Sequence, residues 1–101
     1  MSTESPLSME ADRILTVSRR HGAVFVALFG SAVRGDDGPA SDIDVLVRFS
    51  EPKSLLDLDD IQTEMTKEVG RRIDLVTERS LNPAIRESVQ RDMAVILDEP
   101  A

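Results

Sequence analysis

The sequence predicts a small α/β (α+β) domain in which a mixed β-sheet is flanked by helices. Two observations lead to this fold class. Short, continuous apolar segments alternate along the chain with longer segments in which apolar residues recur at helical spacing. The chain has 101 residues, of which 41% are hydrophobic, and this suits one modest core. We therefore expect a single domain over residues 1–101, with residues 1–7 as a flexible tail.

Three helices are predicted from their periodicity and from the residues at their ends. The first spans about residues 9–21 and stops at Gly22. The second begins at Ser54, with Asp57 three residues on as a capping-box variant, and ends at Gly70. The third begins at Asn82-Pro83. The predicted apolar faces of the first two helices consist of Ala11, Ile14, Leu15 and Ser18, and of Leu58, Ile61, Met65 and Val69.

Four short apolar segments predict strands, at residues 23–29, 43–49, 72–76 and 94–97. The first of them is continuously apolar and has a glycine at each end, which favours a buried strand over a helix. Residues 31–34 leave room for only about one helical turn before Gly35.

Composition and charge exclude several classes of function. The formal net charge of −7 argues against direct nucleic-acid binding, which requires lysine and arginine to neutralise phosphates. The absence of cysteine excludes disulfides, thiol catalysis and cysteine-ligated zinc. The polar N-terminus lacks a signal-peptide pattern, and no apolar run is long enough to cross a membrane. We expect a soluble cytoplasmic protein without membrane contact.

Asp42 and Asp44 stand at the start of the predicted strand 43–49. Residues i and i+2 of a strand face the same side, so both carboxylates can converge on one ion, with Cα atoms ~7 Å apart. Ile43, Val45 and Val47 then face the opposite side, towards the core. A hard divalent ion such as Mg²⁺ prefers oxygen ligands. An exposed strand start is the commoner explanation of an isolated D-x-D pair, and it remains open here.

Gly30-Ser31 follows the predicted buried strand 23–29 directly. Glycine lets the backbone turn tightly and approach a ligand closely. If a short helix begins at Ser31, its free N–H groups and dipole favour a phosphate. An ordinary glycine turn with a serine N-cap is the alternative for this pair alone.

Asp74 interrupts the apolar strand 72–76, between Ile73 and Leu75. If this strand lies beside strand 43–49, Asp74 joins Asp42 and Asp44 on one face. Three such carboxylates could hold two Mg²⁺ ions, ~3.5–4 Å apart in two-metal sites, in a geometry suited to in-line displacement at phosphorus.

Together these segments resemble the minimal nucleotidyltransferase (MNT) family of the DNA polymerase β-like superfamily, and in particular the antitoxins of HEPN/MNT toxin–antitoxin pairs. The spacing of ten residues between Ser31 and Asp42 fits the family's signature, and the resemblance extends from about Arg13 to Glu99. The order of Ala32-Val33 is a small departure. The resemblance is carried by Gly30-Ser31-x-x-Arg34-Gly35, Ser41-Asp42-Ile43-Asp44-Val45-Leu46-Val47 and Ile73-Asp74-Leu75-Val76.

The resemblance implies a polymerase β-like nucleotidyltransferase fold and a role for each motif residue. Gly30 and Ser31 would hold the phosphates of a nucleoside triphosphate, which in this family is ATP. Asp42 and Asp44 would bind two Mg²⁺ ions, and Asp74 would complete one metal site and help to activate the acceptor hydroxyl. Arg34 matches a position that meets the triphosphate, although an ion pair with Asp36 or Asp37 is an equal alternative.

The resemblance also implies a partner. In this family the enzyme transfers AMP to a hydroxyl, typically of tyrosine, on an all-helical HEPN ribonuclease toxin from the adjacent gene, and so silences it. We therefore expect a hetero-oligomer whose acceptor comes from another polypeptide, since the chain is short. Two alternatives remain: a non-catalytic antitoxin that neutralises its partner by binding alone, and a small-molecule nucleotidyltransferase.

Overall fold

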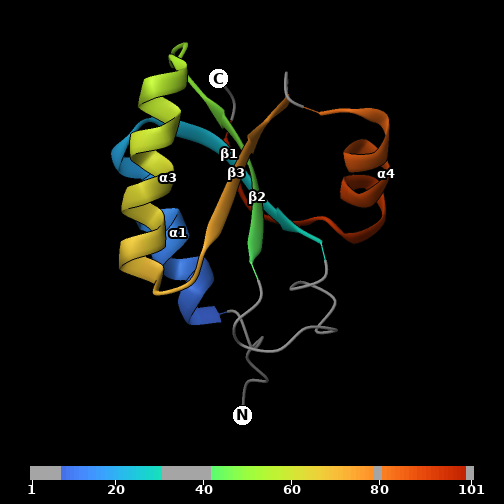
Figure 1. The fold of residues 1–101 in the computed structure, drawn as a ribbon, viewed down its shortest axis with the longest axis horizontal. Coiled ribbons are helices and arrows are strands. Elements are labelled where there is room, and N and C mark those ends of the chain that lie inside the picture. The colour runs from blue at the N-terminus through green and yellow to red at the C-terminus, as the bar shows by residue number, and fades with distance from the viewer. Residues whose placement is uncertain (1–7, 31–41, 79–80, 100–101) are drawn as a thin grey trace.

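The computed structural model describes residues 8–30, 42–78 and 81–99. The expected tail at 1–7 and the expected helical turn at 31–34 lie outside these residues. Three helices and four strands follow one another along the described residues, with β1 and β2 in succession (Figure 1). Their bounds are α1 (Ser8–Arg20), β1 (Ala23–Phe29), β2 (Ile43–Phe49), α3 (Leu55–Val69), β3 (Ile73–Thr77), α4 (Pro83–Asp92) and β4 (Ala94–Asp98).

The structure confirms the predicted helices and strands. The strand predicted at 72–76 is shifted by one residue to Ile73–Thr77, and the carbonyl of Arg72 accepts the Ile43 N–H just before it. Within the described residues, no helix has the length and the apolar content that crossing a membrane requires.

The four strands form one mixed sheet in the order β3-β2-β1-β4. β1 is antiparallel to β2 and to β4, whereas β2 and β3 are parallel. A parallel pair needs a crossover connection, and α3 provides it. Helices α1 and α3 lie on one face of the sheet and α4 on the other (Figure 1). This confirms the predicted fold class.

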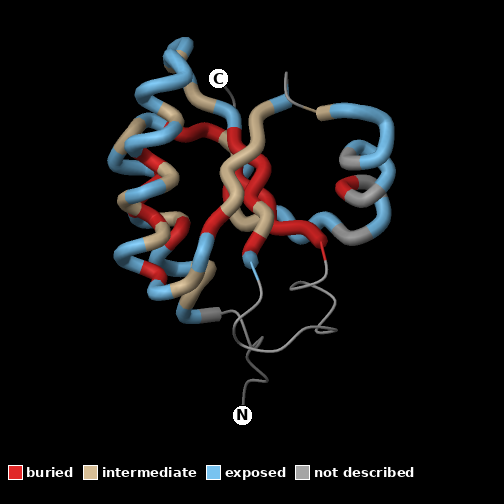
Figure 2. The backbone as a smooth tube through the Cα atoms, viewed as in Figure 1, coloured by how far each residue is buried: buried red, intermediate tan, exposed pale blue. Residues whose placement is uncertain are grey.

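The main core lies between the sheet and helices α1 and α3. Strand β2 contributes Ile43, Val45 and Val47, each with no exposed surface, as predicted for the face opposite Asp44. Val17 of α1 is also fully buried, although the predicted apolar face of this helix did not include it. A smaller cluster under α4 joins Phe29, Leu46 and Val89. Figure 2 shows the buried backbone concentrated in the two central strands, β1 and β2.

Helix α3 has capping groups at both ends, as its sequence predicts. The Ser54 N–H donates to Asp57 Oδ2 and the Asp57 N–H donates to Ser54 Oγ, both at 3.1 Å. The hydrogen bond from the Ser54 backbone lowers the pKa of the Asp57 carboxyl. At the other end Gly70 has a φ of 81° and its N–H donates to the Thr66 carbonyl at 3.0 Å.

Side chains of α1 and the turn after it bind α3 on the outside of the core. Arg20 pairs with Glu64 and, at 2.9 Å, with Glu68. His21 Nε2 lies 3.0 Å from Glu64 Oε1, and this hydrogen bond lowers the pKa of the Glu64 carboxyl. His21 therefore has a structural partner, and Glu64 and Glu68 link α3 to the end of α1 and the turn after it.

The capping box predicts the effect of Ser54→Ala. We expect this change to lower the free energy of unfolding by about 1 kcal/mol, because the Asp57 N–H at the start of α3 loses Ser54 Oγ as its acceptor. Urea unfolding measures it. Thr63→Ala, at an exposed position within the same helix, should be neutral or slightly stabilising. Equal stability of Ser54→Ala and wild type would contradict a contribution from the capping box.

Candidate functional site

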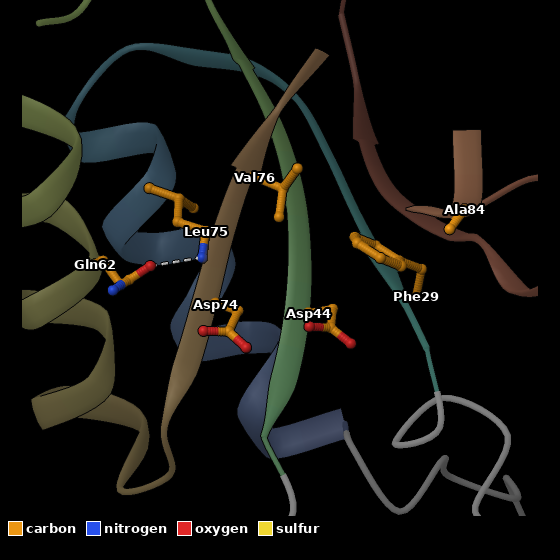
Figure 3. A pocket seen from close by; sticks show the side chains of 7 residues that line it. All are labelled: Phe29, Asp44, Gln62, Asp74, Leu75, Val76 and Ala84. Atoms are coloured by element: carbon orange, nitrogen blue, oxygen red, sulfur yellow. Dashed lines mark hydrogen bonds between the residues drawn. The ribbon is translucent and has the colours of Figure 1, made fainter. Parts of the chain in front are cut away.

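Two carboxylates meet where β2 runs beside β3. In the parallel register Asp44 is the partner of Asp74, and in the antiparallel register Asp44 faces Phe29 at the end of β1. Figure 3 shows the Asp44 and Asp74 side chains next to each other on the same side of the sheet. The structure thus confirms the condition on which the prediction for Asp74 depended, namely that its strand lies beside β2.

Gly30 packs directly against the Asp44 carboxylate. It is buried and has a φ of +89°, a left-handed conformation that favours glycine. A Cβ atom at this position would overlap Asp44 Oδ2. The backbone after β1 can approach the carboxylate only because residue 30 has no side chain.

The pair brings two carboxylates side by side. Burial raises the pKa of the Asp44 carboxyl, and the neighbouring charges of Asp74 and Asp42 add to the effect, which together bring it to about 6. A divalent cation between Asp44 and Asp74 would relieve both effects, because it replaces the lost solvation and screens the repulsion. The donor set consists of carboxylate oxygens and therefore fits Mg²⁺.

Asp42 lies just before β2 and is exposed. Its Oδ2 is 3.8 Å from Nε of Arg72, whose side chain is 73% exposed. Within the described ranges, no three acidic, histidine or cysteine side chains already stand in a metal-binding arrangement. The structure therefore brings Asp44 and Asp74 together, while Asp42 faces Arg72 at the neighbouring position. Ser31 and Arg34, the other predicted site residues, lie outside the described residues.

An open cavity of about 460 Å³ borders the two carboxylates (Figure 3). Its apolar wall comes from β1, β3 and α4, and Gln62 of α3 closes the side beyond the β3 edge. The prediction from sequence missed these wall residues, since nothing in the pattern indicates which loop or helix end approaches the acids. The lining consists of Phe29, Asp44, Gln62, Asp74, Leu75, Val76 and Ala84.

Comparison with known proteins gives consistent matches over most of the chain. The nucleotidyltransferase domain family matches residues 13–96. The protein adenylyltransferase MntA of Thermococcus cleftensis is 35% identical over 92 residues, which are 86% of this chain and 93% of that protein. A solved structure provisionally described as a minimal nucleotidyltransferase is 38% identical, with a TM-score of 0.71, covering 93% of this chain and 98% of that chain.

Solved toxin–antitoxin structures share the fold at lower sequence identity. One, containing AMP-PNP, has a TM-score of 0.77 at 20% identity and covers 87% of this chain and 73% of that chain. Another contains a tri-AMPylated HEPN toxin of Shewanella oneidensis in complex with an MNT antitoxin. Its TM-score is 0.71 at 17% identity, covering 89% of this chain and 71% of that chain. At these identities the likeness concerns the fold alone.

The raised pKa of Asp44 predicts that Asp44→Asn becomes more stable relative to wild type as the pH rises. Because the folded protein holds the Asp44 proton more tightly than the unfolded chain, wild-type protein without metal loses stability as the pH rises from about 4 to about 6. Asparagine does not ionise, so the stability of the variant relative to wild type should rise by about 1 kcal/mol over this window, after allowance for solvent screening.

Urea unfolding in EDTA at several pH values between 4 and 8 measures this difference. Asp98→Asn, which removes an exposed carboxylate from β4, is the control and should show no comparable rise. A stability difference between Asp44→Asn and wild type that stays constant across this range would refute the prediction.

The contact between Gly30 and Asp44 predicts unequal costs for two glycine substitutions. Gly70 also has a positive φ, of 81°, but a Cβ there meets nothing within 4 Å, so Gly70→Ala should cost about 1 kcal/mol of backbone strain alone. Gly30→Ala adds the overlap with Asp44 and should cost roughly 2–3 kcal/mol. Denaturant unfolding measures the loss of stability in both variants. Equal losses would show that the Asp44 side chain moves aside freely.

Proposed function

Because the chain belongs to the nucleotidyltransferase domain family, we propose that it is a cytoplasmic protein adenylyltransferase that acts as an antitoxin. It transfers AMP from ATP to a hydroxyl of a HEPN ribonuclease toxin and thereby neutralises that toxin. The observation that carries this proposal is the pairing of Asp44 with Asp74 beside Gly30, in register on adjacent strands.

The relatives support the choice of protein as acceptor. Thermococcus cleftensis MntA, which this chain matches over nearly its whole length, is named a protein adenylyltransferase. The structures that share the fold include a toxin–antitoxin pair with AMP-PNP and an AMPylated HEPN toxin with its MNT antitoxin. The cavity beside Asp74 is open, which suits an acceptor side chain presented by another polypeptide.

In the proposed reaction each site residue has one task. Asp42, Asp44 and Asp74 hold Mg²⁺, which supplies the positive charge that an acidic chain lacks for a triphosphate. Gly30 allows the backbone to approach the phosphates, and Ser31 and Arg34 donate hydrogen bonds to them. Asp74, beside the open cavity, orients the acceptor hydroxyl and draws its proton.

The bond changes are those of a single displacement. The acceptor oxygen forms a bond to the α-phosphorus of ATP while the bond from that phosphorus to the diphosphate oxygen breaks. The products are the AMP-modified protein and diphosphate, and the hydroxyl proton leaves by way of Asp74. The protein contributes mainly by positioning the groups and by providing a charged site that needs no rearrangement.

We predict that transfer depends on the paired carboxylates. The protein is incubated with α-labelled ATP, Mg²⁺ and the HEPN toxin encoded beside its gene, and label on the toxin is measured. Asp44→Asn and Asp74→Asn should lower the rate by roughly 100-fold or more, because each removes a fixed charge at the reacting phosphate. EDTA should abolish labelling, and Asp98→Asn should leave the rate unchanged.

Two results would overturn parts of the proposal. If wild-type protein neutralises the toxin without labelling it, the protein is an antitoxin that acts by binding alone. If Asp44→Asn and Asp74→Asn transfer AMP at the wild-type rate, the metal site lies elsewhere. Label that appears on a small molecule and never on the toxin would indicate a small-molecule nucleotidyltransferase.

A further inference from the structure

We propose that Gln62 and Thr66 of α3 are positioning residues for Asp74. They hold the edge strand β3 by its backbone on both sides of this carboxylate and so keep it beside Asp44. The expected effect on metal and nucleotide binding rests on the proposed function. The two hydrogen bonds from α3 to β3 are observed in the structure.

Strand β3 is an edge strand, at the end of the order β3-β2-β1-β4. The carbonyl of Arg72 bonds to Ile43 of β2, so the backbone groups of alternate residues from Arg72 onward point towards β2. The N–H groups of Ile73 and Leu75 therefore point away from the sheet. Unpaired edge N–H groups leave a strand free to shift or to pair with another chain.

Helix α3 supplies the acceptors for these two N–H groups. The Leu75 N–H donates to Gln62 Oε1 at 2.8 Å, and the Ile73 N–H donates to Thr66 Oγ1 at 3.2 Å. Both hydrogen bonds are partly buried. Figure 3 shows the first of them alongside the Asp74 side chain.

The spacing of the two contacts explains how one helix can hold the strand at two points. Residues four apart on a helix lie on one face and are about 6 Å apart along its axis. Residues two apart on a strand are separated by nearly the same distance, about 6.6 Å. The spacing of Gln62 and Thr66 thus matches that of their partners, Leu75 and Ile73, and Asp74 is the residue between the two held positions.

The two contacts oppose a specific force. Asp44 and Asp74 are acids in register on neighbouring strands, so when both are ionised they repel each other across the strand pair. On its other edge β3 has no strand neighbour in the described sheet. The hydrogen bonds from α3 fix the backbone that carries Asp74, so the strand cannot relieve the repulsion by moving away from β2.

A matched pair of substitutions at Thr66 tests the proposal. Thr66→Val keeps the shape but removes the acceptor oxygen, whereas Thr66→Ser retains it. Thr63→Val makes the same change at an exposed position of the same helix. Gln62→Met is the second variant, since it removes the amide and keeps the length of the side chain.

Two readouts are taken on the free protein, without any toxin. The first is amide hydrogen exchange at Ile73 and Leu75, measured by NMR. The second is the Mg²⁺ concentration that gives half of the thermal stabilisation by a non-hydrolysable ATP analogue. Thr66→Val should speed exchange at Ile73, and Gln62→Met at Leu75, by roughly three- to tenfold, and both should raise the half-saturating Mg²⁺ concentration by a similar factor. Thr66→Ser and Thr63→Val should match wild type.

Faster exchange with an unchanged Mg²⁺ requirement would overturn the proposal and leave the contacts with a purely structural role. Unchanged exchange would also overturn it, because the backbone would then be held by other groups. Since neither readout uses a toxin, a protein that binds Mg²⁺ and the ATP analogue but labels no toxin refutes the proposed acceptor and leaves the role of Gln62 and Thr66 intact. Wild-type protein that binds no Mg²⁺ with the analogue refutes the positioning role.

Discussion

The parallel pairing of β2 with β3 places two acids side by side, and the rest of the domain holds them there. On the opposite face of the same strands, Ile43, Val45 and Ile73 have no exposed surface. Complete burial of such a side chain contributes roughly 1.5–3 kcal/mol. A few of them therefore outweigh the cost of one half-buried carboxylate, so the alternation of apolar and acidic residues makes a charged site compatible with a stable sheet.

The same pairing sets the constraints on its surroundings. Because Phe29 faces Asp44 in the antiparallel register, the chain leaves β1 directly beside the carboxylate, and only a glycine fits at position 30. Helix α3 connects β2 to β3 and must run back along the sheet, which brings Gln62 and Thr66 to the free edge of β3. The pairing of β2 with its two neighbours thus accounts for the need for glycine at position 30, for the crossover helix α3 and for the position of both acids.

The order of helices and strands was predictable because local chemistry determines it. Gly22, Gly70 and the Ser54–Asp57 capping box mark ends that depend on a few neighbouring residues. The site was predictable in part, since the facing of Asp44 and Asp74 follows from strand alternation once the two strands are neighbours. The contacts of Arg72 with Asp42 and of Gln62 with Leu75 were not, because they join separate elements through flexible polar side chains whose partners no local pattern specifies.

Asp42 differs from the other two acids in its surroundings, and this bears on how the proposed metal site would fill. An exposed ion pair such as that with Arg72, 3.8 Å apart, contributes at most about 1 kcal/mol. Arg72 therefore cannot retain Asp42 against a divalent ion already held by Asp44 and Asp74. In the proposed enzyme the half-buried pair of Asp44 and Asp74 would supply the driving force for binding, since their two charges lie side by side, and Asp42 would complete the coordination from the solvent side. The net charge of −7 adds to the need for the metal, because an acidic chain without it repels a triphosphate.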